Sequence, residues 1–346
     1  MIHDINRKKV VKNAWRITKD RLKTCLRIRV PGGHLDARHL DLMKKISEEY
    51  GNGTVHLTTR QGFEIPGITF ENMPEINKLI SDYIEQTEQQ LGVEIPSPRE
   101  GYPAAGTRNI SACIGNRVCP FANFDTTEMA LRIEKAVYPN DFHVKIAVTG
   151  CPNDCIKAHM QDIGIIGQSL PEYEYGACIG CEACVKNCRK KVTGALKMQD
   201  YKVHRDSRRC IGCGECVLVC PTQAWTRNPE KFFRLVIMGR TGKKSPRLAA
   251  PFAEWLTAEV VVAITRNLYP YIDRYIDRSL VKEHVGYISD RTGYQELRKW
   301  LLRGIKLNPE ARIARTIQWQ GYNYGYDTDT WDTPQSIQAE MAEGVK

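Results

Sequence analysis

Twelve of the thirteen cysteines lie in tight clusters, and this clustering constrains the fold more than any other feature of the 346-residue chain. The clustered cysteines stand at 113/119, 151/155, 178/181/184/188 and 210/213/216/220, and only Cys25 stands apart. Grouped cysteines in a chain without a secretion signal favour metal binding over disulfides. Twelve thiols also divide into three sets of four, and four thiolates are the usual complement of an iron–sulfur cluster.

Two segments repeat one cysteine spacing. Residues 178–188 read CIGCEACVKNC and residues 210–221 read CIGCGECVLVCP, so each contains C-x2-C-x2-C-x3-C. Bacterial two-cluster ferredoxins have this run, and the fourth cysteine of each run ligates the other cluster. The pattern predicts one [4Fe–4S] cluster on Cys178, Cys181, Cys184 and Cys220, and another on Cys188, Cys210, Cys213 and Cys216. Zinc ribbons are the alternative, but they use separate C-x2-C pairs rather than this double repeat.

The remaining four clustered cysteines form two different motifs. CIGNRVC at 113–119 is C-x5-C, and CPNDC at 151–155 is C-x3-C. The spacings alone are compatible with a cluster, a redox pair or buried thiols. Together they resemble the cluster motif of the sirohaem-dependent sulfite and nitrite reductases, in which the last cysteine also bridges to the sirohaem iron. The resemblance implies a third [4Fe–4S] cluster on Cys113, Cys119, Cys151 and Cys155, with Cys155 as the shared ligand.

Other segments extend the resemblance over most of the chain. PGGHL at 31–35 and HLTTRQGFEIPGI at 56–68 are similar to the ferredoxin-like half-domain of that family, and GRTGKKSPRL at 239–248 is similar to its sirohaem-carboxylate loop. The resemblance implies an α+β fold with an inserted domain. We expect a half-domain at 1–92, a mixed α/β sirohaem and [4Fe–4S] domain at 93–170 and 222–310, an inserted bacterial 2[4Fe–4S] ferredoxin domain at 171–221, and a C-terminal tail at 311–346.

The resemblance also implies an anion site. Its cationic residues are Arg60, Arg108, His143 and Lys145, which would bind the substrate and supply protons. His143 stands where better-known members carry lysine, so the substrate affinity and pH profile need not follow the family. Neutral hydrogen bonds are expected from Thr58, Thr59 and Gln61, and cations for the sirohaem carboxylates from Arg240, Lys243, Lys244 and Arg247. The alternatives are surface ion pairs and a solvated basic loop.

Composition limits the partners. The net charge is +10, but the basic residues recur beside glycines and cysteines instead of forming one stripe, which suits a small anion better than a nucleic acid. No apolar run is long enough to span a membrane, and the first fifteen residues contain no apolar signal core, so we expect a cytoplasmic protein. No GxGxxG motif occurs in a strand–turn–helix setting, so electrons must come from another protein.

Local patterns predict the secondary structure. Strands are expected at 21–30, 54–59, 142–148 and 234–240, and helices at 36–50, 73–91, 126–137, 251–268 and 294–305. Residues 171–225 are rich in glycine and cysteine and require metal to fold. Residues 316–346 are polar with scattered aromatics and are expected to wrap a surface or be mobile.

These features predict the catalytic subunit of a sulfite reductase that reduces sulfite to sulfide with six electrons. By resemblance, partner subunits with bound flavin and iron–sulfur clusters would pass the electrons from NADH. The alternatives are nitrite reduction to ammonia with the same cofactors, and a non-catalytic electron-transfer subunit. Because the chain holds one copy of a unit that single-chain members carry twice, we expect a homodimer or a hetero-oligomer.

Overall fold

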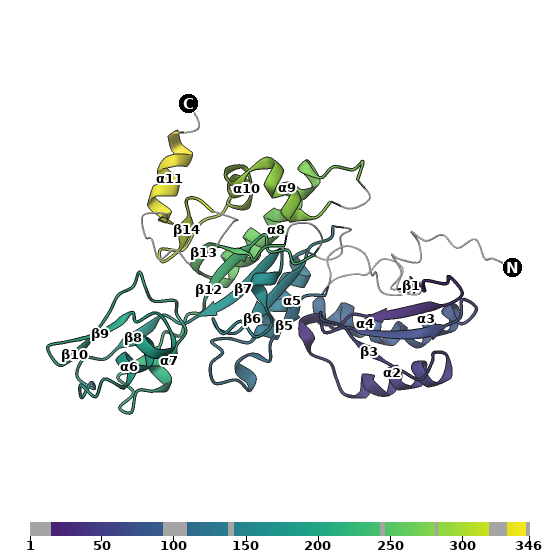
Figure 1. The fold of residues 1–346 in the computed structure, drawn as a ribbon, viewed down its shortest axis with the longest axis horizontal. Coiled ribbons are helices and arrows are strands. Elements are labelled where there is room, and N and C mark those ends of the chain that lie inside the picture. Colours follow the sequence, from purple (N-terminus) through teal and green to yellow (C-terminus); the bar gives the residue numbers. More distant parts are fainter. Residues whose placement is uncertain are drawn as a thin grey trace. The chain divides into compact units, whose positions relative to one another are not determined.

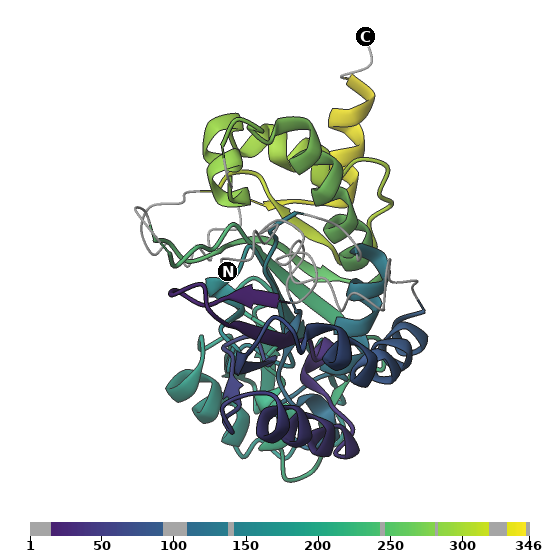
Figure 2. The same ribbon diagram turned by 90° about the vertical axis from the view of Figure 1, so that its right-hand side faces the viewer.

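The computed structural model describes residues 15–92, 109–137, 142–242, 246–280, 283–317 and 331–343. The chain divides into two compact units (Figures 1 and 2). The first unit comprises residues 1–112, 127–146 and 276–285, and the second comprises residues 113–126, 147–275 and 286–346. All twelve clustered cysteines therefore belong to the second unit.

The described part of the first unit contains a four-stranded antiparallel sheet with the strand order β1-β2-β4-β3. The strands of this sheet are β1 Trp15–Ile17, β2 Thr24–Ile28, β3 His56–Leu57 and β4 Phe63–Ile68; the short strand β5 Ser111–Ala112 is not part of it. Its helices are the 3₁₀ turn η1 Pro31–Gly33, α2 Arg38–Glu49, α3 Met73–Leu79, α4 Ser81–Leu91 and α5 Thr126–Val137. Apolar residues of the strands and helices pack together in a core of Trp15, Leu26, Ile28, Met43, Ile46, Ile65, Ile68, Ile76, Ile80, Tyr83 and Ile84.

Two predictions in this unit need correction. The strand expected at 21–30 is confined to Thr24–Ile28, and Leu22 is 73% exposed because it lies in a turn closed by the Thr18 N–H to Lys23 carbonyl hydrogen bond. The single helix expected at 73–91 is two helices, α3 and α4, which meet at Ile80. The Ser81 hydroxyl donates to the Lys78 carbonyl at this junction, so a side chain satisfies a carbonyl at the end of α3.

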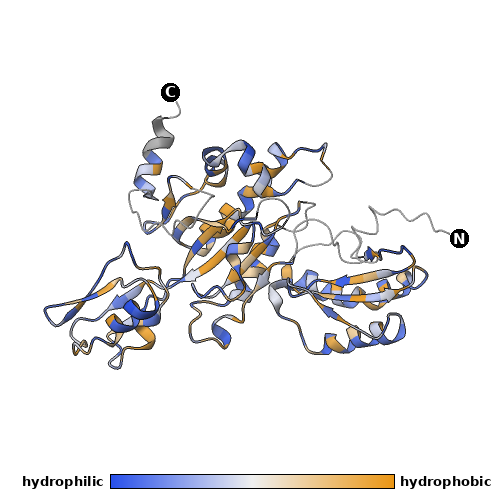
Figure 3. Ribbon diagram, in the orientation of Figure 1, coloured by the Kyte–Doolittle hydropathy of each residue, from blue (hydrophilic) through white to orange (hydrophobic). Residues whose placement is uncertain are grey.

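The second unit is built on a larger sheet in which the strands follow the order β15-β14-β13-β12-β7-β6. These strands are β6 Ile146–Thr149, β7 Ile163–Gln168, β12 Phe232–Ile237, β13 Ala250–Leu256, β14 Arg312–Ala314 and β15 Trp331–Asp332. β6 and β7 are buried along their whole length, and Figure 3 shows the apolar character of the central strands. The long helix α8 Ala258–Tyr275 packs against β12 and α10 (Figure 2).

The rest of the unit comprises short helices and one cysteine-rich segment. The helices are η3 Gly115–Arg117, η4 Ala158–Met160, α9 Val285–Thr292, α10 Tyr294–Leu301 and α11 Pro334–Glu343. We call residues 171–227 the cysteine-rich module. Its elements are β8 Pro171–Tyr173, α6 Ala183–Lys191, β9 Leu196–Gln199, β10 Lys202–Arg205, α7 Glu215–Leu218 and β11 Trp225–Arg227. β8 pairs with β11, and β9 pairs with β10.

Two further expectations are wrong in this unit. The helix expected at 251–268 begins only at Ala258, because the apolar residues before it form β13 in the large sheet. The segment 311–346 is not a separate tail in its described part, since β14 pairs with β13 and β15 pairs with β14. Among the described residues, no helix is long and apolar enough to cross a membrane.

Candidate metal centres

The C-x5-C and C-x3-C motifs lie on adjacent loops of the second unit. The Gly150 N–H donates to Cys113 Sγ at 3.1 Å, and the Cys113 N–H donates to the Val148 carbonyl at 3.1 Å. Two glycines allow this approach: a Cβ on Gly150 would lie 2.5 Å from Ala122 Cβ, and a Cβ on Gly167 would lie 2.5 Å from the Gly150 carbonyl oxygen. Both cysteine loops therefore stack closely on β7.

The four thiols of these motifs gather in one place. Burial raises the pKa of the Cys151 thiol, and the nearby thiols of Cys119, Cys113 and Cys155 raise it further. Cys151 is buried and Cys155 is exposed, whereas the other two thiols are half-buried. The arrangement can hold a cluster on four thiolates and leaves one side of it open at Cys155.

A buried aspartate shapes the C-x3-C loop. Asp154 adopts the left-handed φ of 47°, and its carboxylate accepts the N–H groups of Ala158 at 2.6 Å and His159 at 3.2 Å. The same carboxylate lies 2.7 Å from His159 Nδ1. Asp154 thus fixes the backbone immediately before Cys155. Sequence reasoning assigned no role to Asp154 or His159, although an aspartate inside a cysteine loop with a histidine five residues later is a detectable signal.

The cysteine-rich module contains two cavities that correspond to the two predicted ligand sets. The lining of the first cavity includes Cys178, Cys181, Cys184 and Cys220, and the lining of the second includes Cys188, Cys210, Cys213 and Cys216. Burial raises the pKa of the Cys213 thiol to about 11 and also raises that of Cys216. Iron binding would have to overcome these shifts, because the ligands are thiolates.

The thiols surround these spaces instead of converging on one point. No three Cys, His, Asp or Glu side chains in the described ranges form a group that could hold a single metal ion. A cubane has four irons and takes one thiolate at each, so its ligands are spread around it. The two cavities fit that requirement.

The wall of the second cavity lies close to the loops of the C-x5-C and C-x3-C motifs. A Cβ on Gly214, next to Cys213, would lie 3.2 Å from Asn123 Oδ1, and the Asn123 N–H donates to the Gly150 carbonyl at 2.8 Å. The Arg227 side chain of β11 donates to the Pro120 carbonyl at 2.9 Å, directly after Cys119. These contacts join the residues around the second cavity directly to the loop that carries Cys113 and Cys119.

In the first unit, the residues expected at the anion site begin with a tight turn between β3 and β4. The Thr58 hydroxyl accepts the N–H groups of Arg60 at 3.3 Å and Gly62 at 3.0 Å, and the Thr58 N–H donates to the Gly62 carbonyl. The Arg60 carbonyl accepts a hydrogen bond from Asn109 Nδ2 at 2.6 Å. Thr58 and Thr59 differ in setting, because Thr58 is half-buried in the turn whereas Thr59 is exposed.

Gln61 fastens this turn to β5. Its side-chain oxygen accepts the Ala112 N–H at 2.8 Å, and its Nε2 donates to the Ala112 carbonyl at 2.7 Å. Both ends of the amide are thus engaged with the residue that precedes Cys113.

Replacing Gln61 by alanine should lower the free energy of unfolding by about 1–3 kcal/mol, because both Ala112 backbone groups lose their partner. Urea unfolding of Gln61→Ala would measure this loss. Thr59→Ala is the matched control on the same turn, and its exposed side chain predicts a change within about 0.5 kcal/mol. Equal effects of the two substitutions would show that the Gln61 amide does not fasten the turn.

The other expected anion ligands are only partly described. His143 is half-buried and meets His284 edge to face, with ring centroids 4.7 Å apart. Lys145 is half-buried in the same segment. Arg108, Lys243 and Lys244 lie outside the described residues. His284 had no distinguishing spacing in the sequence, and only the fold reveals its contact with His143.

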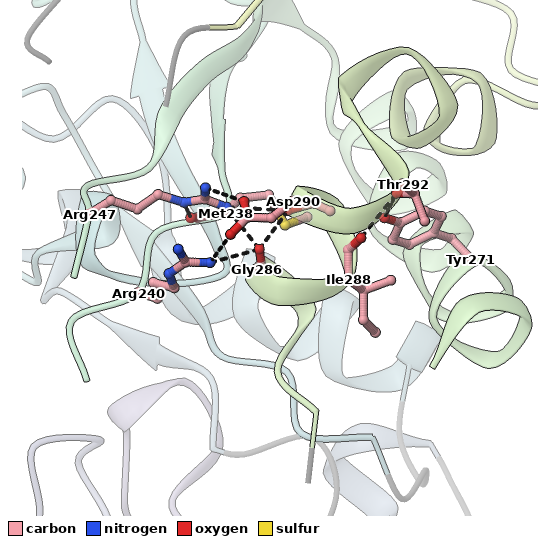
Figure 4. Close-up of polar contacts among 9 residues, drawn as sticks. Met238, Arg240, Arg247, Tyr271, Gly286, Ile288, Asp290 and Thr292 are labelled. Carbon is pink, nitrogen blue, oxygen red and sulfur yellow. Dashed lines mark hydrogen bonds and ion pairs between the residues drawn. The ribbon is translucent and has the colours of Figure 1, made fainter. Parts of the chain in front are cut away.

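Arg240 and Arg247 converge on one carboxylate in the second unit (Figure 4). Arg240 Nη1 lies 2.5 Å from Asp290 Oδ2, and Arg247 also forms an ion pair with Asp290. Both guanidinium groups donate to the Gly286 carbonyl, and that of Arg240 lies 4.3 Å from the centre of the Tyr287 ring. Arg240 and Arg247 are therefore both held against α9, and for these two residues the alternative of a solvated position does not apply.

Comparisons with known proteins identify the class. The family model described as the nitrite and sulphite reductase 4Fe-4S domain matches residues 104–308, and the nitrite/sulfite reductase ferredoxin-like half domain matches residues 16–83. The chain belongs to the nitrite and sulphite reductase family. The α+β fold class and the N-terminal half-domain are thereby confirmed, whereas the inserted ferredoxin domain remains a prediction.

Individual proteins within this class are similar to the chain to different degrees. The chain is 42% identical over 309 residues to a subunit of the anaerobic sulfite reductase of Salmonella typhimurium, a match that covers 89% of this chain and 92% of the relative. It is 32% identical over 143 residues to the chloroplastic ferredoxin–nitrite reductase of Zea mays, covering 40% of this chain and 23% of that protein. The crystal structure of dissimilatory sulfite reductase I shares the fold, with a TM-score of 0.64, 16% identity, and coverage of 87% of this chain and 72% of that chain.

Proposed function

We propose that this chain is the catalytic subunit of a sulfite reductase that converts sulfite to hydrogen sulfide. The observation that carries the proposal is the gathering of twelve cysteines into three sets of four on a chain 42% identical to a subunit of anaerobic sulfite reductase. The reaction consumes six electrons and eight protons per sulfite dianion and releases three waters. It therefore needs an anion site, a proton supply and an electron supply.

The residues present fit the proposed cofactors. The thiols of Cys113, Cys119, Cys151 and Cys155 lie together, and the exposed position of Cys155 suits a thiolate shared with a sirohaem. When bound at these thiols, a [4Fe–4S] cluster joined to sirohaem would supply the electrons for reduction of the anion. Arg240 and Arg247 share one carboxylate, so this group keeps a net positive charge that would attract the sirohaem carboxylates, together with Lys243 and Lys244.

The chain's own cations would handle charge and protons. Arg60, Arg108 and Lys145 would neutralise the anion by charge-assisted hydrogen bonds, and His143 would add a group that exchanges a proton near neutral pH. The Thr58 turn and the Gln61 amide would position Arg60. Protons for the departing oxygens would pass through these groups and ordered water.

The electrons would come from partner subunits. We propose donor subunits that carry flavin and iron–sulfur clusters and pass electrons from NADH, as the sequence resemblance implies. The Salmonella typhimurium relative is named as one subunit of its reductase, which supports a multi-subunit assembly. The two ligand sets of the cysteine-rich module would hold two further [4Fe–4S] clusters that carry the electrons inward.

Cofactor content tests this proposal without turnover. Protein purified anaerobically should contain about thirteen irons per chain, because three cubanes hold four each and the one extractable sirohaem holds another. Acid extraction and iron analysis would measure both. About eight irons with no sirohaem would favour the electron-transfer subunit instead.

Nitrite reduction to ammonia is the second candidate function, and the similarity to the ferredoxin–nitrite reductase of Zea mays supports it. Nitrite and sulfite are both small anions that need the same cations. Product analysis with each substrate separates the two functions.

His143→Lys should keep sulfite reduction and flatten its dependence on pH below neutrality. A lysine stays protonated across this range, whereas a histidine changes charge within it. Turnover with a reduced dye between about pH 5.5 and 8 would measure the profile. An unchanged profile would remove His143 from the proton supply.

A further inference from the structure

The cysteine-rich module contains the same tetrapeptide twice in different surroundings. CIGC occurs at 178–181 and at 210–213. In the second copy, the Ile211 carbonyl accepts a hydrogen bond from Gln168 Nε2 at 3.2 Å, and the Gly212 carbonyl accepts one from the Ser169 N–H at 2.7 Å. Gly212 is buried, and a Cβ on it would lie 2.9 Å from the Trp255 ring. The large sheet and its flanking residues therefore cover this copy.

The first copy is open on the corresponding side. Ile179, the equivalent of Ile211, is 68% exposed, and Cys181 is exposed. The described neighbour of Gly180 is Tyr201, whose carbonyl oxygen would lie 3.1 Å from a Cβ there. Figure 1 shows the β9–β10 hairpin, which carries Tyr201 at its turn, at the end of the module remote from β12.

Two exposed aromatic side chains accompany the exposed Ile179 of this loop. Tyr201 is 87% exposed and Tyr175 is 59% exposed. Lys202 joins them: its Nζ donates to the Tyr175 and Cys178 carbonyls at 2.9 Å each and lies 4.4 Å from the centre of the Tyr175 ring. We call Tyr175, Ile179 and Tyr201 the outer patch.

The turn that presents Tyr201 adopts an unfavourable backbone conformation. Asp200 and Tyr201 have left-handed φ values of 50° and 59°. Two-residue hairpins of this kind usually place asparagine and glycine there, since a tyrosine costs conformational energy at positive φ. The turn thus holds a large aromatic side chain in solvent, where it contributes nothing to the core. Exposed aromatic residues gathered in one place are typical of protein interfaces.

We propose that the outer patch is the docking surface for the iron–sulfur donor subunit, and that the Cys178 set is the point of electron entry. This inference rests on the proposed function. Residues of the large sheet cover the second CIGC loop, on the side of the module that contacts the Cys113 loop. The first CIGC loop has the same sequence but is exposed, and we infer that a partner protein covers it. Each encounter passes one electron from the reduced donor, which leaves oxidised by one electron.

Charge defines the partner. Residues 171–227 contain ten lysines and arginines against six acidic residues. Arg189, Lys190 and Lys191 lie exposed in the last turn of α6. Bound clusters would add the negative charge of their thiolates, so the exposed cations at the end of α6, and not the module as a whole, favour a donor with an acidic surface. The basic residues steer the encounter, and the outer patch provides the close contact.

The test compares the double variant Tyr175→Ser/Tyr201→Ser, which leaves the CIGC loop intact, with Leu40→Ser, which removes an exposed apolar side chain from α2 in the first unit. The donor subunits, co-expressed and purified, serve as the probe. We expect their Kd for the double variant to rise more than about tenfold, because two central apolar residues are lost. The visible spectrum, iron content and dye-driven sulfide production should match wild type. Leu40→Ser should bind the donor as wild type does.

Binding of the double variant within about twofold of wild type would overturn the docking surface. A rise in Kd accompanied by lost iron would also overturn it, since the substitutions would then act on the ligand loop. The charge reversal Arg189→Glu/Lys190→Glu/Lys191→Glu should slow donor-driven turnover and leave dye-driven turnover intact; equal slowing of both would contradict the steering role. Wild-type protein that produces no sulfide with dye would refute the proposed function, whereas the binding comparison would still decide the docking surface.

Discussion

Cys155→Ala lowers dye-driven sulfite reduction by more than about a hundredfold, because loss of even an outer-shell partner of a metal ligand typically costs 10–100-fold. The iron content falls from about thirteen to about eight per chain, since one cubane and the sirohaem are lost and two cubanes remain. The exposed position of Cys155, next to the backbone fixed by Asp154, makes it the ligand that a sirohaem could share. Iron analysis and steady-state turnover measure the two effects on one preparation.

Cys25→Ala is the matched control for this prediction. Cys25 lies in β2, where burial raises the pKa of its thiol to about 11, and it belongs to none of the clusters. This control should keep all its iron and its activity. A Cys155→Ala protein that keeps about thirteen irons and full turnover would remove Cys155 from the catalytic centre.

Glu134→Ala destabilises the first unit by about 3–5 kcal/mol, the usual loss when one partner of a buried ion pair is removed. Glu134 on α5 is fully buried, and its carboxylate pairs with Arg29, which follows β2 and has a side chain only 9% exposed. Without the carboxylate, the Arg29 charge stays buried beside the core. Urea unfolding followed by circular dichroism measures the loss.

An exposed pair provides the comparison. Glu75 and Lys78 lie one turn apart on α3 at 3.6 Å, and both side chains are more than half exposed. Glu75→Ala should change the free energy of unfolding by less than about 1 kcal/mol. A Glu134→Ala loss as small as this would show that the Arg29 charge gains water or another partner when Glu134 is removed.

The cysteine spacing predicts ligand sets because its information is local. The double C-x2-C-x2-C-x3-C run predicts which cysteines share a set, including the exchange of Cys188 and Cys220, and the linings of the two cavities include the cysteines of those sets. The pattern predicts a helix over 251–268, because a short apolar run such as 251–256 does not distinguish a buried strand from the start of a helix. Its pairing with β12 depends on residues distant in the sequence.

Long-range contacts account for what the sequence did not reveal. Gly150 and Gly167 allow two loops to pack closely on β7. The residues next to them in the sequence give no sign of this packing. Asp290 neutralises part of the charge on Arg240 and Arg247 from a position more than forty residues away. Ile179 is exposed, whereas Ile211 lies in a loop that the large sheet covers. Both belong to the same tetrapeptide, CIGC, so the motif alone cannot predict which copy is exposed.

Anaerobic turnover of the purified chain with a reduced viologen dye tests the central claim most directly. Sulfite and nitrite are supplied separately, and sulfide and ammonia are quantified over a range of substrate concentrations. The account predicts sulfide from sulfite with a higher kcat/KM than ammonia from nitrite, without any donor subunit. Ammonia from nitrite as the preferred product, or no product from either anion in protein that contains sirohaem, would contradict it.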